Sequence, residues 1–317
     1  MPVEAPFERL AQKIIPQAKL LRTWPLAGGI SAQMIAFEVE HTTGRLQKMI
    51  VRYYSERTLN THPHVADDQF RLLQVMHSSG LCTPNPLYCD PSGEIFGKPC
   101  LVLEYITGNL NFSLSNLVSA MHQFAFQLTR IHNAKMTNYD LSFLYKRSNA
   151  CVEITNLPHM QMNAIMQEER IRTALSSVGS MSLENTAVLL HGDYWPGNVL
   201  WQDDKLVAVI DWEDTALGDP LIDLAISRLD LVWIFGIEAM HTFTQQYQLL
   251  MDIDYTCLPY WDLCAALRLI RIAGSDLAEW VAFFEPYGRS DITIDAFLAN
   301  YQYFIDQAFE KLASVYR

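Results

Sequence analysis

Cysteines are few and scattered in this sequence. Its 317 residues contain six of them, and no two form a C-x-x-C pair. Zinc sites and redox motifs place cysteines at short fixed spacings, so neither kind of site is indicated. The simplest interpretation is that the thiols are reduced and buried, as is usual in a cytoplasm. The cysteines are Cys82, Cys89, Cys100, Cys151, Cys257 and Cys264.

Long apolar segments are also missing. No run of about twenty uncharged apolar residues occurs, so the sequence predicts no membrane-spanning helix. Residues 1–20 mix charged and apolar positions like an amphipathic helix, whereas a secretory signal peptide has an unbroken apolar stretch. We therefore expect a cytoplasmic protein with no membrane partner. Apolar residues make up 50% of the chain, enough for a sizeable core, and the length suits two lobes or one large domain.

Basic residues are outnumbered by acidic ones. Lys and Arg total 23 against 35 Asp and Glu, which gives a formal net charge of -12 at pH 7. Nucleic-acid binding needs a basic face to neutralise phosphates, and none stands out, so we expect no nucleic-acid partner. The negative charge weakly favours a cationic small-molecule ligand, although many cytoplasmic enzymes are acidic for solubility alone.

The most informative stretch of the chain lies between residues 187 and 219. Its first loop carries Asp193 and, five positions later, Asn198, and Asp211 follows the last apolar run. Protein kinases have this order in their catalytic segment: an Asp, an Asn five positions on, and a metal-binding Asp at a later strand end. Three short apolar runs in the stretch predict strands, at residues 187–190, 199–201 and 206–210.

Phosphoryl transfer explains why these residue types would be combined. A hydroxyl nucleophile needs a carboxylate to accept its proton, and Mg2+ prefers hard oxygen ligands. We therefore expect Asp193 to be the catalytic base, and Asn198 and Asp211 to hold Mg2+. A solvated acidic turn is the plain alternative, and for His191 a structural role in holding the loop is the better interpretation.

At these residues the sequence resembles the aminoglycoside phosphotransferase and choline kinase family, small-molecule relatives of protein kinases. The resemblance implies an α+β, protein-kinase-like fold with two lobes. Residues 1–106 would form a small antiparallel-sheet lobe that binds nucleotide, and residues 107–317 a larger, mainly helical lobe with the catalytic loop and the acceptor region. The matching segments are His191-Gly-Asp193-x4-Asn198, Ile210-Asp211-Trp212-Glu213 and Gly218-Asp219-Pro220-x2-Asp223-Leu224-Ala225.

The resemblance also places nucleotide contacts in the first lobe. Gly28, Gly29 and Ser31 lie between two strand-like runs, where glycines would let backbone N–H groups approach phosphates. A plain hairpin is the competing interpretation of these residues. The segment 103–108 resembles the family's interlobe hinge, which implies that the Glu104 carbonyl and the Ile106 amide contact adenine.

Two positions depart from the family pattern. Arg52 stands where the family has a Lys that meets the α- and β-phosphates; Arg keeps the charge but differs in geometry. In the following helix the family has a Glu that pairs with this basic residue, and here that position holds Gln69, with Asp68 just before it. The ion pair is therefore either moved to Asp68 or replaced by a neutral hydrogen bond.

Apolar spacing predicts helices over much of the chain. The first covers residues 5–22, interrupted or kinked at Pro16. Within the helix at 114–133, His122 and His132 are expected on the polar face. Further helices are predicted at 62–79, 161–178, 229–235, 237–251, 260–272, 277–284 and 292–315. Asp219 suits capping of the helix that follows it, and Asp223 is expected to brace the loop.

These features together predict a phosphotransferase that moves the γ-phosphate of ATP or GTP to a hydroxyl of an aminoglycoside-, choline- or amino-alcohol-like molecule, with Mg2+. A first alternative is a nucleotide-binding pseudokinase with a regulatory role, which Arg52 and Gln69 make more credible. A second is a metallohydrolase that uses His191, Asp193 and Asp211 as ligands. The sequence leaves the acceptor and the choice between ATP and GTP open.

Overall fold

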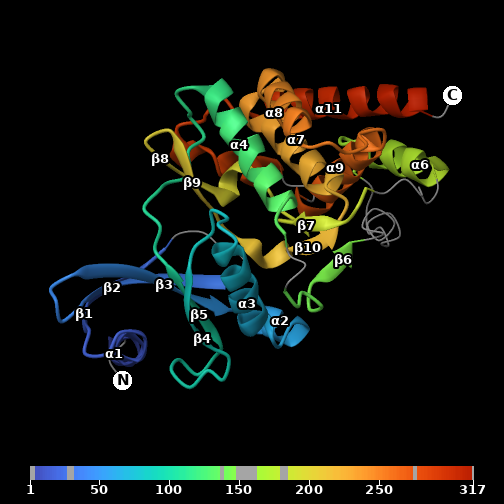
Figure 1. The fold of residues 1–317 in the computed structure, drawn as a ribbon. Coiled ribbons are helices and arrows are strands. Elements are labelled where there is room, and N and C mark those ends of the chain that lie inside the picture. The colour runs from blue at the N-terminus through green and yellow to red at the C-terminus, as the bar shows by residue number, and fades with distance from the viewer. Residues whose placement is uncertain are drawn as a thin grey trace. The chain divides into compact units, whose positions relative to one another are not determined.

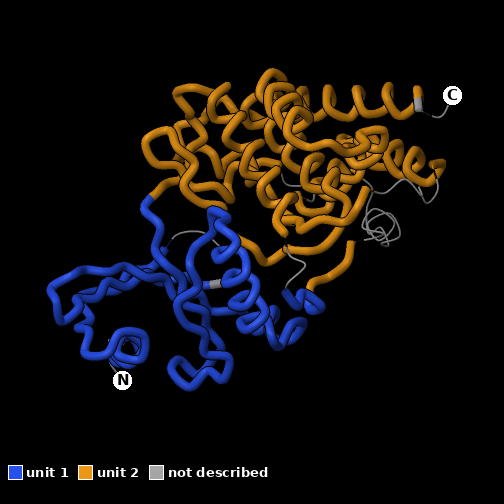
Figure 2. Tube along the Cα trace, viewed as in Figure 1, with its two compact units in different colours: residues 1–107, 136–143 blue, residues 108–135, 144–317 orange. Residues whose placement is uncertain are grey.

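The computed structural model describes residues 4–26, 32–135, 139–147, 163–178, 185–273 and 277–315. The chain divides into two compact units (Figure 2). Unit 1 comprises residues 1–107 together with 136–143, and unit 2 comprises residues 108–135 together with 144–317.

Unit 1 is built on a five-stranded sheet with the strand order β1-β2-β3-β5-β4 (Figure 1). Every neighbouring pair in it is antiparallel. The strands are β1 Lys19–Pro25, β2 Ala32–Glu40, β3 Leu46–Tyr54, β4 Pro86–Asp90 and β5 Cys100–Glu104.

Helix α1, Glu4–Ile14, covers part of this sheet. Its buried Phe7 and Leu10 pack in one core with residues of β2, β3 and β5. The prediction of a helix over residues 5–22 was wrong at its second half, because the helix ends before Pro16 and β1 already begins at Lys19. Proline lacks the N–H that a helix interior needs, so the chain turns here instead of continuing.

Two helices lie between β3 and β4. Ser55 caps α2, Glu56–Thr61, by accepting the Thr58 N–H, and this short helix was not predicted. Helix α3, Val65–Ser78, matches the predicted amphipathic helix and buries Leu72, Leu73 and Met76. It packs against β4 and β5, so the apolar spacing read from the sequence is the face that meets the sheet.

Unit 2 is mainly helical. Helix α7 is its centre: it contacts α8, α9 and α11, and nearly all of its residues are buried. A helix that is buried on nearly all sides belongs in a core. The longer helices are α4 Leu117–His132, α6 Glu168–Val178, α7 Leu221–Phe235, α8 Ile237–Leu250, α9 Leu258–Ala273 and α11 Ile294–Val315. The shorter α10 is Leu277–Ala282.

Two small sheets complete unit 2. In one, β10 pairs antiparallel with β7 and parallel with β6. The other is the hairpin β8–β9, whose turn residues Asp203 and Asp204 both have positive φ. Asp tolerates the left-handed backbone region better than most residues. A two-residue turn with positive φ also matches the twist of a hairpin. The strands are β6 Tyr145–Arg147, β7 Val188–Leu190, β8 Val199–Gln202, β9 Lys205–Val209 and β10 Ala216–Gly218.

The expected α+β fold, an antiparallel sheet followed by a mainly helical unit, is confirmed. The expectation that all thiols are reduced was wrong for Cys264, which is disulfide-bonded. Cys151 lies outside the described residues. Cys82, Cys89, Cys100 and Cys257 are not disulfide-bonded. No helix in the described part of the chain combines the length and apolarity needed to cross a bilayer.

Candidate active site

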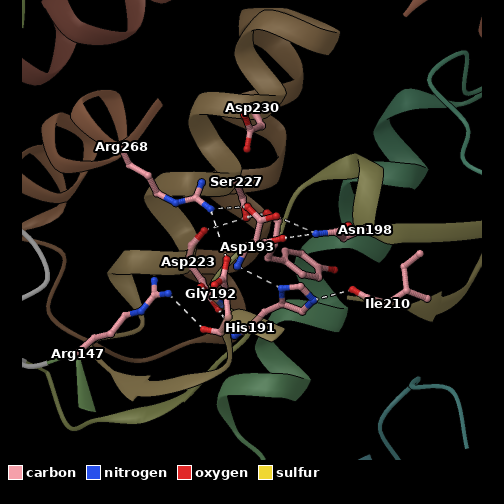
Figure 3. Close-up of polar contacts among 12 residues, drawn as sticks. Arg147, His191, Gly192, Asp193, Asn198, Ile210, Asp223, Ser227, Asp230 and Arg268 are labelled. Carbon is pink, nitrogen blue, oxygen red and sulfur yellow. Dashed lines mark hydrogen bonds and ion pairs between the residues drawn. The ribbon is translucent and has the colours of Figure 1, made fainter. Parts of the chain in front are cut away.

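The loop that joins β7 to β8 holds the expected catalytic base (Figure 3). Asp193 lies three residues after the end of β7, and Asn198 closes the short 3-10 helix η1, Pro196–Asn198. The Asn198 side-chain Nδ2 donates to the backbone oxygen of Asp193 at 2.9 Å and to its Oδ2 at 3.0 Å. Sequence spacing and folded geometry therefore agree on bringing these two side chains together.

The β8–β9 hairpin places Asn198 and Asp211 at the same end of its two strands. Val199 pairs with Val209, and the Ile210 N–H donates to the Asn198 carbonyl at 2.9 Å, so the two expected metal ligands flank the same end of the hairpin. Asp211 has φ 63° and ψ 66°, a left-handed conformation that non-glycine residues seldom adopt. Such backbone strain gathers at functional sites because the surrounding structure imposes it.

This donor set fits Mg2+. Because the Asn198 nitrogen donates to Asp193, its amide oxygen is the atom that would act as a ligand, beside the carboxylate of Asp211. Mg2+ typically takes one or two protein oxygens and completes its shell with water and substrate phosphates. Among the described residues, no group of three or more His, Cys, Asp and Glu side chains is arranged to hold a metal ion.

Helix α7 holds the loop between β7 and β8 through Asp223. Its Oδ2 accepts the His191 N–H at 2.7 Å and its Oδ1 accepts the Gly192 N–H at 2.9 Å. The side chain is fully buried; burial opposes ionisation, yet hydrogen bonding and the charge of His132 leave the pKa of Asp223 below its ordinary value. A carboxylate that accepts several N–H groups is a rigid brace, as expected for this residue.

His132 is the other buried partner of that carboxylate. Its Nε2 lies 3.2 Å from Asp223 Oδ2 and its Nδ1 lies 2.6 Å from the Tyr247 hydroxyl. The expectation that His132 sits on the polar face of its helix was therefore wrong. Buried polar groups are tolerated when they are paired, and Asp223 and Tyr247 supply the pairing.

His191 has the structural role expected of it. The Asp193 N–H donates to His191 Nδ1 at 3.2 Å, which makes Nε2 the protonated nitrogen. That Nε2 lies 3.0 Å from the Ile210 carbonyl, one residue before Asp211. The ring is fully buried, and its two hydrogen bonds link the loop that carries Asp193 to the end of the β8–β9 hairpin.

Gly192 brings two backbone segments into close contact. Its φ is 86°, and a Cβ there would lie only 2.0 Å from the Asp214 carbonyl oxygen. That same oxygen accepts a hydrogen bond from the Arg147 guanidinium at 3.3 Å. Glycine is thus required on two counts, the left-handed backbone and the lack of space.

The loop is also anchored through Tyr194, which is fully buried. Its hydroxyl donates to the Phe124 carbonyl on α4 at 2.9 Å, and its own carbonyl accepts from the Ser227 hydroxyl on α7 at 2.7 Å. Ser227 lies one helical turn after Asp223, so one face of α7 forms hydrogen bonds with the loop at two points.

Arg268 is a site residue that the sequence did not reveal. It lies on α9, and its Nη2 is 2.7 Å from Asp193 Oδ1 and 3.9 Å from Asp214 Oδ2 (Figure 3). The side chains of Arg268 and Asp193 are 24% and 28% exposed, so the pair is shielded yet reachable. The only sequence signal is a charged residue among apolar neighbours, Leu267 and Leu269, on a largely buried helix.

Asp230 adds a buried acid on the same helix as Asp223 and Ser227. Its Oδ1 accepts the Trp233 indole N–H at 3.1 Å. Burial, and then repulsion from Asp193, raise the pKa of Asp230 to about 7, against a weaker opposing effect of Arg268. This carboxyl therefore titrates near neutral pH.

Unit 1 carries the expected nucleotide contacts that fall on described residues. Arg52 is buried in β3 between Met34 on β2 and Leu101 on β5. Gln69 on α3 accepts the Tyr54 hydroxyl at 2.8 Å. Glu104 ends β5 at an exposed position, and Ile106 follows two residues later. The expected phosphate contacts Gly28, Gly29 and Ser31 lie outside the described residues.

Comparison with known proteins points to one family. Residues 23–261 match the sequence model of the phosphotransferase enzyme family. Acyl-CoA dehydrogenase family member 11 of Rattus norvegicus is 23% identical to the chain over 257 residues, which is 72% of this chain and 33% of that protein. The chain thus spans about a third of the length of this curated relative.

Solved structures share the fold at low sequence identity. Spectinomycin phosphotransferase in complex with ADP and spectinomycin aligns with a TM-score of 0.61 and 14% identity, covering 98% of this chain and 99% of that one. Choline kinase LicA from Streptococcus pneumoniae aligns with a TM-score of 0.57 and 18% identity, covering 99% of this chain and 100% of the other.

Proposed function

Because the chain belongs to the phosphotransferase enzyme family, we propose that it transfers the γ-phosphoryl group of ATP or GTP to a hydroxyl group of a small molecule. The observation that carries this proposal is the fixed carboxylate of Asp193, held by Asn198 on a loop that Asp223 anchors to α7. Phosphoryl transfer depends on positioning and on charge rather than on covalent chemistry by the protein, and rigidly held polar groups suit it.

Asp193 is the proposed base. Its carboxylate would accept the proton of the acceptor hydroxyl and orient the oxygen toward the phosphorus. Asn198 fixes the carboxylate through Oδ2, so that its orientation is set before the acceptor arrives. Asn198 Oδ1 and the Asp211 carboxylate would hold Mg2+, which supplies charge neutralisation at the phosphates when bound.

Nucleotide contacts are proposed for unit 1. Arg52 would meet the phosphates from β3, with Gly28, Gly29 and Ser31 giving backbone N–H groups. The backbone of Glu104 and Ile106 would contact the base of the nucleotide. Support comes from the fold shared with a phosphotransferase that was solved with ADP.

An amino-bearing acceptor is proposed, of the aminoglycoside, choline or amino-alcohol kind. The net charge of -12 favours the approach of cations. The names of two proteins with the same fold, spectinomycin phosphotransferase and choline kinase, refer to substrates of this kind.

A kinase screen tests the proposal. The purified chain would be given Mg2+ with ATP or GTP and a library of hydroxylated amines, sugars, amino alcohols and antibiotics, with ADP or GDP release as the readout. We expect acceptor-dependent release with at least one compound, and mass spectrometry should find the phosphorylated product. Nucleotide binding without transfer to any acceptor would contradict the proposal and favour the pseudokinase alternative, to which the neutral Gln69 on α3 lends support.

A further inference from the structure

The positive charge beside Asp193 comes from outside the catalytic loop. Residues 191–198, His-Gly-Asp-Tyr-Trp-Pro-Gly-Asn, contain no Lys or Arg. The cation is Arg268, 75 positions further along the chain, with its Nη2 2.7 Å from Asp193 Oδ1. An arginine thus reaches the carboxylate from helix α9.

The geometry brings this guanidinium close to where the reaction would occur. A hydroxyl bound to a catalytic carboxylate lies about 2.6–3.2 Å from it, and the phosphorus it attacks about 3–3.5 Å beyond. A group within hydrogen-bond distance of that carboxylate is therefore a neighbour of the transferring phosphoryl group. The guanidinium has five N–H donors in a planar fork, and such a fork matches phosphate oxygens.

Arg268 is held by a rigid support. Six residues earlier on α9, Asp262 forms a buried two-point ion pair with Arg228 of α7, both at 3.0 Å. Helix α7 in turn holds the catalytic loop through Asp223. Arginine and base therefore stand on elements that are joined through the core, which is the preorganisation that electrostatic catalysis requires.

We propose that Arg268 is a catalytic arginine, supplied in cis, that binds the transferring phosphoryl group during the reaction. The inference rests on the proposed function. The acceptor oxygen forms a bond to the γ-phosphorus, the bond from that phosphorus to the β–γ bridging oxygen breaks, and the hydroxyl proton passes to Asp193. Arg268 keeps its protons and offsets the charge on the equatorial oxygens.

A binding experiment separates this role from a structural one. Wild type, Arg268→Ala, Arg268→Lys and Arg271→Ala would be titrated with MgADP, first alone and then with aluminium fluoride, which mimics the transferring phosphoryl group. Arg271 is an exposed residue of the same helix and gives the matched control.

We expect all four proteins to bind MgADP equally. Aluminium fluoride should tighten this binding in wild type and Arg271→Ala, tighten it partly in Arg268→Lys, and leave it unchanged in Arg268→Ala. If aluminium fluoride tightens MgADP binding equally in Arg268→Ala and wild type, the role of Arg268 is overturned and the proposed function stands. The same holds if wild type binds MgADP but aluminium fluoride does not tighten that binding. If wild type binds MgGDP and not MgADP, the same titrations use MgGDP. A wild type that binds neither MgADP nor MgGDP would overturn the proposed function, and the assignment with it.

Turnover gives a second readout. With an acceptor found in the screen, Arg268→Ala should lose roughly 100-fold or more in kcat with little change in KM. Added guanidinium chloride, at a concentration that leaves thermal unfolding unchanged, should restore part of that rate and should not affect Arg271→Ala. A variant that keeps the wild-type kcat, or one whose loss lies only in KM, would contradict the role.

Discussion

The Oδ2 atom of Asp223 lies 2.7 Å from the backbone nitrogen of His191, although 32 residues separate the two in sequence. This contact joins the core helix α7 to the first residue of the loop that carries Asp193. Because the other oxygen of Asp223 accepts the next N–H, the loop has its place before any ligand binds. The position of Asp193 therefore depends on a buried residue of the core helix.

Replacing Asp223 with Asn should destabilise the protein. Both carboxylate oxygens accept backbone N–H groups, so an amide would aim its own donor at one of them in either orientation. We expect a loss of about 2–4 kcal/mol in the free energy of unfolding, and a large drop in turnover. Urea unfolding measures the first, with Asp252→Asn at an exposed site as control. Equal stability of the two variants would show that the contact is not a brace.

Gly192→Ala should lower the free energy of unfolding much more than Gly44→Ala does. Both glycines have positive φ, 86° and 78°, so both substitutions carry about 1–2 kcal/mol of backbone strain. Only at Gly192 does the new Cβ meet a backbone oxygen, at 2.0 Å, whereas at Gly44 nothing lies within 4 Å. Overpacking should add at least about 1–3 kcal/mol for Gly192→Ala. Thermal and urea unfolding of both variants tests this, and similar losses would contradict the close approach.

Asn198→Ala and Asp211→Asn should raise the Mg2+ requirement. Each removes an oxygen proposed as a Mg2+ ligand, so the Mg2+ concentration for half-maximal rate should rise at least roughly tenfold. Asp203→Asn, an exposed substitution in the turn of the same hairpin, provides the control and should leave the requirement unchanged. Wild-type Mg2+ dependence in Asp211→Asn would remove this residue from the metal site.

Asp230→Asn should change how stability depends on pH. In the unfolded chain the carboxyl titrates near 3.8, whereas burial, and then repulsion from Asp193, raise its pKa in the folded protein to about 7. Between these values the folded chain binds more protons than the unfolded one, so the Asp230 contribution to wild-type stability falls as pH rises through this window. Asn cannot ionise and keeps an oxygen for the Trp233 indole.

The free energy of unfolding of Asp230→Asn should therefore exceed that of wild type by up to roughly 4 kcal/mol above pH 7, and by almost nothing below about pH 4. Urea unfolding at a series of pH values measures the difference. Asp295→Asn, an exposed change of the same kind, should show no such trend. A pH-independent difference for Asp230→Asn would mean that this carboxyl titrates as it does in water.

Local patterns explain what the sequence could predict. Asp193, Asn198 and Asp211 lie on one loop and the hairpin that follows it, so their spacing carries most of their geometry. Strand β7, predicted at residues 187–190, runs from Val188 to Leu190, because a short apolar run bounded by polar residues is a local signal. Pro16 was visible as a helix breaker, but spacing alone did not show that the chain would turn into a strand after it.

Contacts over long sequence distances explain what it could not predict. Arg268 is an ordinary helix residue until α9 packs beside the catalytic loop, and nothing in the spacing relates it to Asp193. His132 looks like a polar-face residue because its partners, Asp223 and Tyr247, come from two other helices. Buried polar residues of this kind can be recognised only when their partners are known.

The central claim is that Asp193 is the base of a phosphoryl transfer. The most direct measurement compares Asp193→Ala with wild type in two assays on the same preparation, the rate of acceptor-dependent ADP or GDP release and the affinity for the Mg2+–nucleotide complex. We expect a rate loss of roughly 10²–10⁴-fold with unchanged nucleotide affinity. A variant that binds nucleotide and turns over at the wild-type rate would contradict it.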